Sequence, residues 1–297
     1  MEQQYHIPVL LNECIEALEI KPEGVYVDVT FGGGGHSKEI LKYLTTGKLY
    51  AFDQDPDASM NLPENENLVF IPHNFGSMRN WLAFHGVQQV DGVLADLGVS
   101  SHQFDTGDRG FSIRFDGPLD MRMNPNQGIS AAEWLNGVEL AELATVLGKY
   151  GEVDHPMKVA RTIQANKPIH TTMGLIDALK GLEGRGKASQ FLAQVFQALR
   201  MQVNNELEVL EAMLLQSVEV LKPSGRLVVI SYHSLEDRMV KELLRTGNVQ
   251  GELKKDFFGN IQRELVPLKA KPILPSKEEL EKNKRSRSAK LRVGIKK

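Results

Sequence analysis

The sequence predicts an α/β protein with a mostly parallel sheet and an inserted helical domain. Three observations support this class. Short apolar segments rich in branched and aromatic residues alternate with segments of helical spacing. One apolar segment, residues 25–29, is followed by four glycines at 32–35 and then by a helical pattern, the opening of a nucleotide-binding βαβ unit. Three apolar segments end in aspartate, and the carboxyl ends of parallel strands share one edge of a sheet.

Length and composition fit an ordinary globular protein. The 297 residues are enough for one large domain or two, and 41% hydrophobic with 25% charged residues is typical of a soluble chain. The single cysteine, Cys14, excludes an internal disulfide framework and fits a reducing cytoplasm. We find no metal-site spacing, secretory signal or membrane-spanning apolar run. We therefore expect a cytoplasmic protein without a metal.

Charge is unevenly distributed along the chain. Residues 269–297 hold eleven Lys and Arg against three Glu, a net charge of +8, whereas the remaining residues carry −11. A basic segment on an acidic body indicates contact with a polyanion. On charge alone, a solvated segment that only keeps the protein soluble explains the pattern equally well.

The glycine-rich turn indicates which ligand the sheet edge binds. Glycine permits positive φ and lets a ligand approach the main chain closely. In the dinucleotide fingerprint the third glycine packs helix on strand, but Ser37 or Lys38 occupies that position here, which disfavours NAD. Asp28, late in the preceding strand, suits a cationic ligand such as S-adenosylmethionine, because opposite charges attract in a partly desolvated cleft. The alternative is that the glycines form only a flexible turn.

Two strands are expected after the turn. Residues 47–53 form one that ends in Asp53, where a nucleotide-binding fold places the carboxylate that accepts the ribose hydroxyls. Residues 68–71 form the other, and Phe75 follows it. Phe75 either lies against an adenine ring or packs in the core.

A fourth strand, residues 90–98, again contains an acid near its end, Asp96. Together with Asp28 and Asp53, it places three acids at successive strand ends, which is hard to explain as solvated surface. In an open α/β sheet this edge binds ligands. The following loop, residues 99–103, stands where amino-group methyltransferases place their active-site loop.

Residues 105–201 are expected to form the helical insert. Residues 105–127 are dense in Gly, Asp, Arg and Pro and predict a long, ordered, functional loop. Ser130 and Glu133 have the spacing of a capping box, and helical patterns follow without a strand among them. Such a cap would recognise the substrate; the alternative is a scaffold without a substrate role.

The α/β pattern resumes after the insert. Residues 205–221 predict an amphipathic helix that Pro223 and its neighbours stop. Residues 226–232 predict a fifth strand. Residues 264–268 and 290–295 are expected to form two final strands.

Taken together, these motifs resemble the ribosomal RNA small subunit methyltransferase H family. The resemblance runs from end to end of the chain. It departs from the family pattern at Gly33, where a larger residue such as Arg is common, and at His102, where Pro is common. The matching segments are residues 6–11, 28–36, 96–101, 109–112, 116–123, 131–135, 231–238 and 285–292.

The resemblance implies a class I S-adenosylmethionine-dependent methyltransferase with a Rossmann-like sheet. Residues 1–104 and 202–297 would form the core, and residues 105–201 the insert that recognises the substrate. The implied reaction methylates the exocyclic N4 of one cytidine in 16S rRNA near the ribosomal P site, within the 30S subunit. The implied cofactor contacts are Gly34, Gly35, His36, Asp53, Phe75, Asp96 and Gln103.

Methylation of an exocyclic amine needs hydrogen-bond acceptors near the amino hydrogens, because they localise the lone pair and then help the proton leave. The candidates, at two strand ends, are Asp96, Ser100, Ser101, His233 and Asp237. Methylation of cytosine C5 needs a thiolate instead. Cys14 lies on the apolar face of the helix expected at residues 8–18, outside these motifs.

Three other functions are weighed against this one. A methyltransferase acting on another amine, in DNA or protein, is disfavoured in the DNA case because residues 96–99 lack the usual Asn/Asp-Pro-Pro-aromatic loop. An NAD-dependent oxidoreductase lacks the third glycine. A non-enzymatic RNA-binding assembly factor would need no cofactor pocket. The sequence leaves open whether the chain forms homo-oligomers.

Overall fold

The computed structural model of the chain describes residues 8–182 and 188–297. The chain divides into two compact units: one comprises the residues up to Gly98 together with Leu207–Lys297, and the other comprises Val99–Glu206. The expected insert, residues 105–201, lies inside the second unit.

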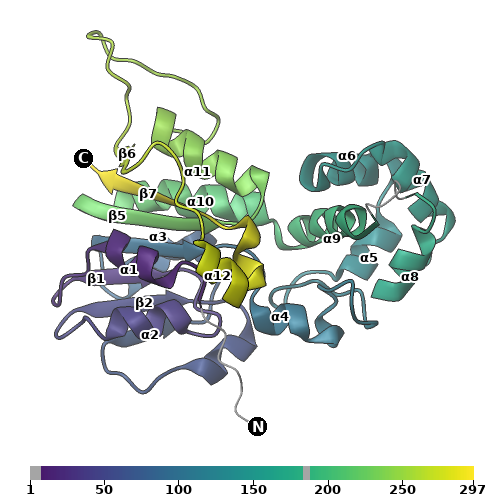
Figure 1. Ribbon diagram of the computed structural model, residues 1–297, viewed down its shortest axis with the longest axis horizontal. Helices are drawn as coiled ribbons and strands as arrows, with labels where there is room; N and C mark the ends of the chain where they lie inside the picture. Colours follow the sequence, from purple (N-terminus) through teal and green to yellow (C-terminus); the bar gives the residue numbers. More distant parts are fainter. Residues whose placement is uncertain (1–7, 183–187) are drawn as a thin grey trace. The chain divides into compact units, whose positions relative to one another are not determined.

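The first unit is built on a seven-stranded sheet in the order β3-β2-β1-β4-β5-β7-β6 (Figure 1). The strands β1 to β5 are parallel to their neighbours in this series, whereas β7 is antiparallel to both β5 and β6. The predicted mostly parallel α/β sheet is therefore confirmed. The strands are β1 (Val25–Asp28), β2 (Lys48–Phe52), β3 (Leu68–Ile71), β4 (Val90–Asp96), β5 (Leu221–Ser231), β6 (Leu265–Pro267) and β7 (Lys290–Lys296).

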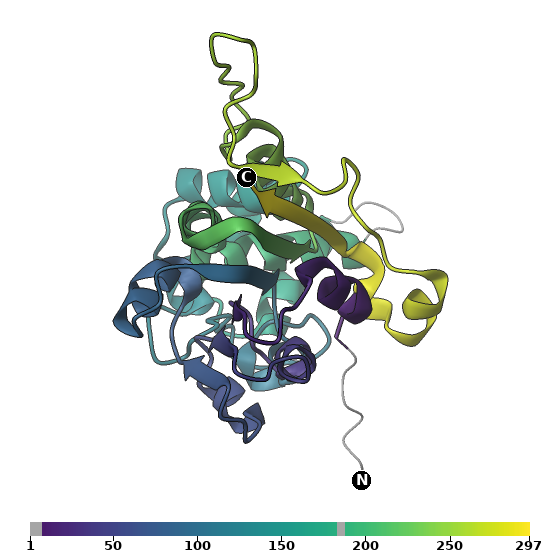
Figure 2. The same cartoon turned by 90° about the vertical axis from the view of Figure 1, so that its left-hand side faces the viewer.

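Helices cover both faces of this sheet, because the central strands are apolar on both sides. On one face α1 and α2 pack against side chains such as Tyr26 and Leu94. On the other face α3, α10 and α11 pack against side chains such as Val27 and Val93, and Figure 2 shows α1 and α3 on opposite sides. The helices are α1 (Leu11–Leu18), α2 (Gly35–Leu41), η1 (Pro56–Asn61), η2 (Phe75–Ser77), α3 (Met78–Phe84), α10 (Glu206–Val220), α11 (Ser234–Thr246), α12 (Lys277–Lys282) and η4 (Lys284–Ser288).

Two element boundaries differ from the sequence-based expectation. The first helix begins at Leu11 rather than at residue 8, because Leu10 adopts a left-handed conformation with φ 52°. The Pro223 segment does not separate helix from strand: β5 already begins at Leu221, and the strand register shifts opposite Val90 and Gly92. The Pro-Ser-Gly segment is therefore an irregular start of β5, with Ser224 at positive φ.

The second unit is helical. An isolated bridge between Pro118 and Thr171 is its only β pairing among the residues that the structure describes. Ser130 caps α5 as predicted: its Oγ accepts the N–H of Glu133 (3.2 Å), and the Glu133 carboxylate accepts the N–H of Ser130 (2.7 Å). The elements are α4 (Ser101–Asp105), η3 (Gly107–Arg109), α5 (Ala131–Gly137), α6 (Leu140–Gly151), α7 (Pro156–Ala165), α8 (Thr172–Ala178) and α9 (Ala188–Asn204).

The long loop between α4 and α5 is held by partly buried polar contacts. The Arg109 side chain donates to the carbonyl oxygens of Arg122 (3.1 Å) and Met123 (3.0 Å). Asp120 accepts hydrogen bonds from the Arg122 guanidinium at 2.9 and 2.7 Å. These contacts explain why a segment so rich in Gly and Pro is ordered. Across residues 8–182 and 188–297, no helix is long and apolar enough to span a bilayer.

Candidate active site

Three aspartates lie at the carboxyl ends of neighbouring strands, as predicted. Asp28 ends β1, Asp96 ends β4, and Asp53 directly follows β2. The strand order reverses between β1 and β4, because β1 continues to β2 on one side and β4 continues to β5 on the other. Such a reversal creates the crevice in which open α/β sheets bind ligands.

Asp28 is buried at this edge of the sheet, with 1% of its surface exposed. Its carboxylate accepts hydrogen bonds from the Ser37 hydroxyl (2.7 Å) and the Thr30 N–H (3.0 Å). Burial raises the pKa of Asp28 despite these hydrogen bonds. The expected direct contact of Asp28 with a cationic ligand is therefore corrected, since this side chain has almost no accessible surface and instead holds the glycine turn to β1.

The positions of the glycine turn, residues 32–35, differ in how strictly they require glycine. Gly32 and Gly34 have φ values of 51° and 75°, which favour glycine. A Cβ on Gly35 would lie 2.2 Å from Cγ of Pro8, so only glycine fits against the residues before α1. A Cβ on Gly33 would meet nothing within 4 Å, so lack of space does not require glycine at this position.

The ring of His36 is buried, with 6% of the residue exposed. Its Nε2 lies 3.1 Å from the carbonyl oxygen of Val9, and its Nδ1 lies 3.8 Å from Oδ2 of Asp96. The ring thus connects the start of α2 with the end of β4. A cofactor contact from His36, if made, would come from its backbone rather than from its buried ring.

Asp96 is partly accessible, because 23% of its side chain is exposed. Its Oδ1 accepts a hydrogen bond from the Tyr232 hydroxyl (2.7 Å), and its N–H donates to Thr30 Oγ1 (2.7 Å). Burial raises the pKa of Asp96 to about 6, although the neighbouring His36 and the Tyr232 hydroxyl act in the opposite direction. A carboxylate with this pKa is ionised at neutral pH and is a stronger base than an ordinary aspartate.

Tyr232 is a site residue to which sequence reasoning gave no role. It directly follows β5, so its hydroxyl reaches the same edge as Asp96. Burial and the adjacent Asp96 carboxylate raise the pKa of Tyr232, which therefore stays a hydroxyl donor. Its place after an apolar strand is the same signal that identified the three aspartates.

Asp53 closes the edge on the β2 side. Its carboxylate accepts the N–H of Gly32 (2.7 Å) and the N–H of Asp55 (2.9 Å). Burial raises the pKa of Asp53 to about 6. Each oxygen keeps a second lone pair for another donor. Phe75, at the start of η2, is half-buried and packs on the core beneath the sheet, so part of its ring surface is accessible.

Ser100, Ser101 and Gln103 belong to the second unit. Ser100 caps α4: its Oγ accepts the N–H of Gln103 (3.2 Å), and Oε1 of Gln103 accepts the N–H of Ser100 (3.1 Å). Gln103 is buried and Ser101 is half-buried. The contact of Gln103 with a cofactor and the participation of the two serines in catalysis stay predictions.

His233 and Asp237 lie at the start of α11. Nδ1 of His233 accepts the N–H of Glu236 (3.4 Å), which makes His233 the cap of the helix. Asp237 accepts hydrogen bonds from Arg292 at 2.6 and 3.2 Å and from Lys290 at 3.4 Å. Burial alone would raise the pKa of Asp237, but these cations of β7 hold it below its usual value. These contacts favour a positioning role for Asp237 over proton transfer.

Comparisons with known proteins agree with this geometry. The MraW methylase family matches residues 3–297. "Ribosomal RNA small subunit methyltransferase H" of Bacteroides fragilis is 50% identical over 300 residues, covering 100% of this chain and 99% of that protein. The protein of the same name from Christiangramia forsetii is 53% identical over 299 residues, covering 99% and 98%.

Among solved structures, an rRNA methylase from Streptococcus thermophilus has a TM-score of 0.40 and 12% identity, covering 96% of this chain and 93% of that one. The sheet order and the glycine turn are those of the expected class I S-adenosylmethionine-dependent methyltransferase core. The full-length match and the extent of identity to curated relatives show that this chain belongs to the MraW methylase family.

Proposed function

We propose that this chain, an S-adenosylmethionine-dependent rRNA methyltransferase by its family, methylates the exocyclic N4 of one cytidine in 16S rRNA near the ribosomal P site. The name of its half-identical, full-length relatives supports the small-subunit rRNA as substrate. The observation that carries the choice of an amino acceptor is the accessible Asp96 carboxylate, fixed by Tyr232 at the switch point of the sheet.

The residues of the edge fit S-adenosylmethionine, which supplies a methyl group on a positively charged sulfur. Asp53, half-buried and with lone pairs still available, would accept the ribose hydroxyls. The accessible part of Phe75 would lie against the adenine ring. The backbone at Gly34 and Gly35 would hold the methionine end, where α2 begins without a side-chain cap. The partly exposed Asp96 would add a negative charge that favours a positively charged ligand.

Cytosine N4 is a weak nucleophile because its lone pair is delocalised into the ring. Asp96 would accept a hydrogen bond from the amino group, which localises the lone pair on nitrogen. In the displacement that S-adenosylmethionine would supply, the new N4–carbon bond replaces the carbon–sulfur bond, whose electron pair stays on sulfur; the methylated nitrogen would then carry one proton too many, and Asp96 would accept it. Tyr232 would act as a positioning residue, because its hydroxyl holds one oxygen of Asp96 and leaves the other for the substrate.

Ser100 and Ser101 remain candidate acceptors in the second unit, and Gln103 a candidate cofactor contact. His233 and Asp237 would act on the reaction through the β5–α11 corner that they stabilise.

Methylation at cytosine C5 is disfavoured by the state of the cysteine. Cys14 is fully buried in the core between α1 and the sheet. Burial raises the pKa of its thiol well above the usual value, so no thiolate is available at neutral pH.

The basic segment 269–297 is folded, and ten of its eleven cations fall into two groups; the eleventh, Arg285, is half-buried. Lys290 and Arg292 pair with Asp237, and Lys296 pairs with Glu264. Seven others are exposed and would contact the RNA backbone: Lys269, Lys271, Lys277, Lys282, Lys284, Arg287 and Lys297.

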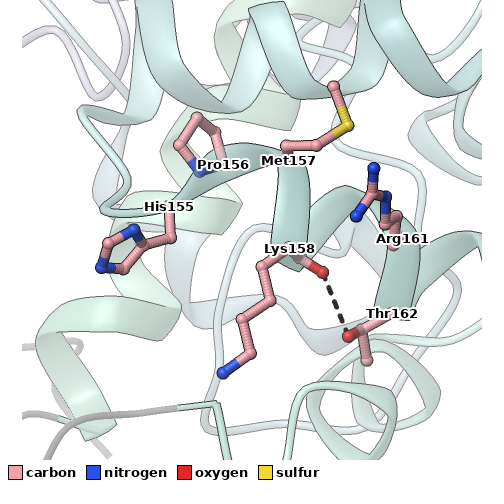
Figure 3. Close-up of a pocket in the computed structure, with 6 residues that line it drawn as sticks. All are labelled: His155, Pro156, Met157, Lys158, Arg161 and Thr162. Carbon is pink, nitrogen blue, oxygen red and sulfur yellow. Dashed lines mark hydrogen bonds between the residues drawn. The ribbon is translucent and has the colours of Figure 1, made fainter.

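A pocket in the second unit supports substrate recognition by the insert. The pocket has a volume of about 400 Å³ and lies at the start of α7, with Pro156 and Met157 as apolar lining and Lys158 and Arg161 extending beside them (Figure 3). Both cations are exposed, and neither forms an ion pair with any other residue that the structure describes. A base against the apolar lining with its phosphate at the cations would fit this arrangement.

The proposal is tested with methyl-labelled S-adenosylmethionine and 30S subunits from cells that lack this protein. The labelled nucleoside is identified by mass spectrometry, with naked 16S rRNA as the parallel substrate. We expect N4-methylcytidine on the particle and little or none on naked RNA. Label on C5 or on a ribose would contradict the amino acceptor, and label on naked RNA alone would contradict recognition of the 30S subunit.

A further inference from the structure

A hairpin between α11 and β6 carries the most exposed aromatic side chains of residues 8–182 and 188–297. We define the aromatic hairpin as residues 251–264, which extend away from the sheet in both views (Figures 1 and 2). Phe257 is 97% exposed and Phe258 is 85% exposed. Their ring centroids are 5.7 Å apart with an interplanar angle of 88°. Two adjacent phenyl rings exposed to this extent indicate a contact surface rather than a packing residue.

The tip of the aromatic hairpin is held by Asp256. Its carboxylate accepts the N–H groups of Phe258 (2.9 Å) and Asn260 (2.8 Å) and the Asn260 side-chain amide (3.0 Å). Gly259, with φ 86°, completes the turn by donating its N–H to the carbonyl oxygen of Asp256 (3.0 Å). The two rings are thus presented on a fixed backbone, which lowers the entropy lost on binding.

The base of the hairpin is attached to α11. The Arg263 guanidinium donates to the carbonyl oxygens of Leu244 and Arg245, both at 3.0 Å, in the last turn of that helix. Asn248 and Glu252 exchange two hydrogen bonds, at 2.7 and 3.0 Å. The hairpin therefore belongs firmly to the first unit.

The hairpin lies at the edge of the sheet opposite the aspartates. In the register of the sheet, Leu265 at the start of β6 pairs with Lys296, and Arg226, the first residue of β5 that pairs with β7, lies opposite Ile295. The hairpin precedes Leu265, so it leaves the sheet at the amino ends of the parallel strands, whereas Asp96 lies at their carboxyl ends. The exposed rings can therefore take no part in methyl transfer and must act on a remote part of a large partner.

The charges beside the rings indicate the chemistry of that partner. Lys254 and Lys255 are exposed, and neither has an ion-pair partner among the residues described. Aromatic rings close to exposed cations fit unpaired nucleotides, since bases stack on the rings while phosphates attract the lysines. An apolar pocket of a protein would match the rings but would leave the two lysines without partners.

We infer that the aromatic hairpin docks on unpaired nucleotides of small-subunit rRNA, with Phe257 and Phe258 stacked on bases and Lys254 and Lys255 at phosphates. The choice of rRNA rests on the proposed function; the recognition of unpaired nucleotides rests on the hairpin itself. The hairpin serves affinity and not the chemical step, because it lies at the opposite edge of the sheet from Asp96.

The test compares the full chain with the double variant Phe257→Ala/Phe258→Ala. We expect the Kd for 16S rRNA and the KM for 30S subunits to rise on the order of tenfold or more. Turnover at saturating 30S and the affinity for S-adenosylmethionine should not change. Phe84→Ala, which removes another ring that is 77% exposed, is the matched control and should leave all four quantities unchanged.

A second variant separates stacking from simple apolar contact. Phe257→Leu/Phe258→Leu keeps apolar side chains but removes the ring faces, so docking on RNA predicts the same loss as the alanine variant, and Phe257→Trp/Phe258→Trp should restore binding. Full binding by the leucine variant would overturn the inference in favour of a protein partner. A molar mass in solution that falls from dimer to monomer in the alanine variant would overturn it in favour of a second copy.

Failure of the docking inference and failure of the proposed function give different results. If the hairpin does not bind RNA, all variants bind 16S rRNA like the wild type while N4-methylcytidine still forms. If the proposed reaction is wrong, another product or none is found, while binding of a single-stranded RNA oligonucleotide still depends on the two rings.

Discussion

Replacing Asp96 by Asn should make the protein more stable and less active. Burial raises the pKa of Asp96 from its usual 3.8 to about 6, and each pKa unit is worth about 1.4 kcal/mol. Keeping this carboxylate ionised in the folded protein above pH 6 therefore costs about 3 kcal/mol of folding free energy. Asparagine retains an oxygen for the Tyr232 hydroxyl (2.7 Å from Oδ1 in the wild type) but carries no charge. Asp96→Asn should raise the free energy of unfolding at pH 7.5 by up to about 3 kcal/mol.

The pH dependence distinguishes this reason from a packing effect. A folded-state pKa above the unfolded one means that the penalty is complete above about pH 6 and falls as the pH approaches the unfolded value near 4. The difference between variant and wild type, measured by urea unfolding at several pH values, should therefore shrink to well under 1 kcal/mol at about pH 4. A difference independent of pH would refute the electrostatic explanation.

Asp237→Asn is the matched control with the opposite sign. Its pKa is depressed by Arg292 and Lys290 despite burial, so its ionised form stabilises the fold above the unfolded pKa, and that contribution is lost as the pH falls. We expect Asp237→Asn to lower stability at pH 7.5 and to have little effect in acid.

For catalysis, Asp96→Asn should reduce turnover at saturating cofactor about 10²-fold or more, because the amide accepts no proton. An Asp96→Asn variant with the turnover of the wild type would refute proton transfer to Asp96. The turnover of the wild type should decline below about pH 6.

Three further predictions use other parts of the first unit. Gly35→Ala should weaken S-adenosylmethionine binding, measured by calorimetry, and lower the free energy of urea unfolding by about 1–3 kcal/mol, because its Cβ would lie 2.2 Å from a proline carbon. Gly33→Ala is the control and should leave both quantities unchanged, because its Cβ would have nothing within 4 Å. Cys14→Ala should keep methyl transfer per folded molecule, and its complete loss in a folded variant would revive C5 chemistry. Lys284→Ala/Arg287→Ala, which removes two exposed cations, should weaken rRNA binding and reduce the slope of log Kd against log salt by about 2; an unchanged slope would count against the basic segment.

The sequence located the acidic edge because strand ends are a local property. An apolar run followed by Asp specifies both a strand and its exit point, so Asp28, Asp53 and Asp96 were correctly placed at one edge. The solvent accessibility of each aspartate side chain cannot be predicted from this strand pattern. Asp28 and Asp96 end adjacent strands, yet one is sealed by Ser37 and Thr30 while the other is partly exposed.

Contacts between distant segments escaped the sequence for a physical reason. The hydrogen bond from Tyr232 to Asp96 joins residues 136 positions apart and exists only because β5 pairs with β4. Periodicity identifies a strand but not its neighbour in the sheet, so the sequence does not predict the ion pairs of Asp237 with β7. His233 and Asp237, two catalytic candidates from one motif, form structural contacts instead. The exposed rings of the aromatic hairpin also have no periodic signal, since they lie in a turn.

The position of β7 has a consequence for how the protein folds during synthesis. β7 comes after every other strand in chain order, yet it lies between β5 and β6 in the sheet. Until residues 290–296 have left the ribosome, β5 therefore has an unpaired outer edge and β6 has no partner in the sheet. An unpaired edge on a strand that contains the apolar run 227–230 is a site for aggregation and for chaperone binding. The nascent chain should stay protease-sensitive around β5 until β7 emerges, and become resistant in a single late step.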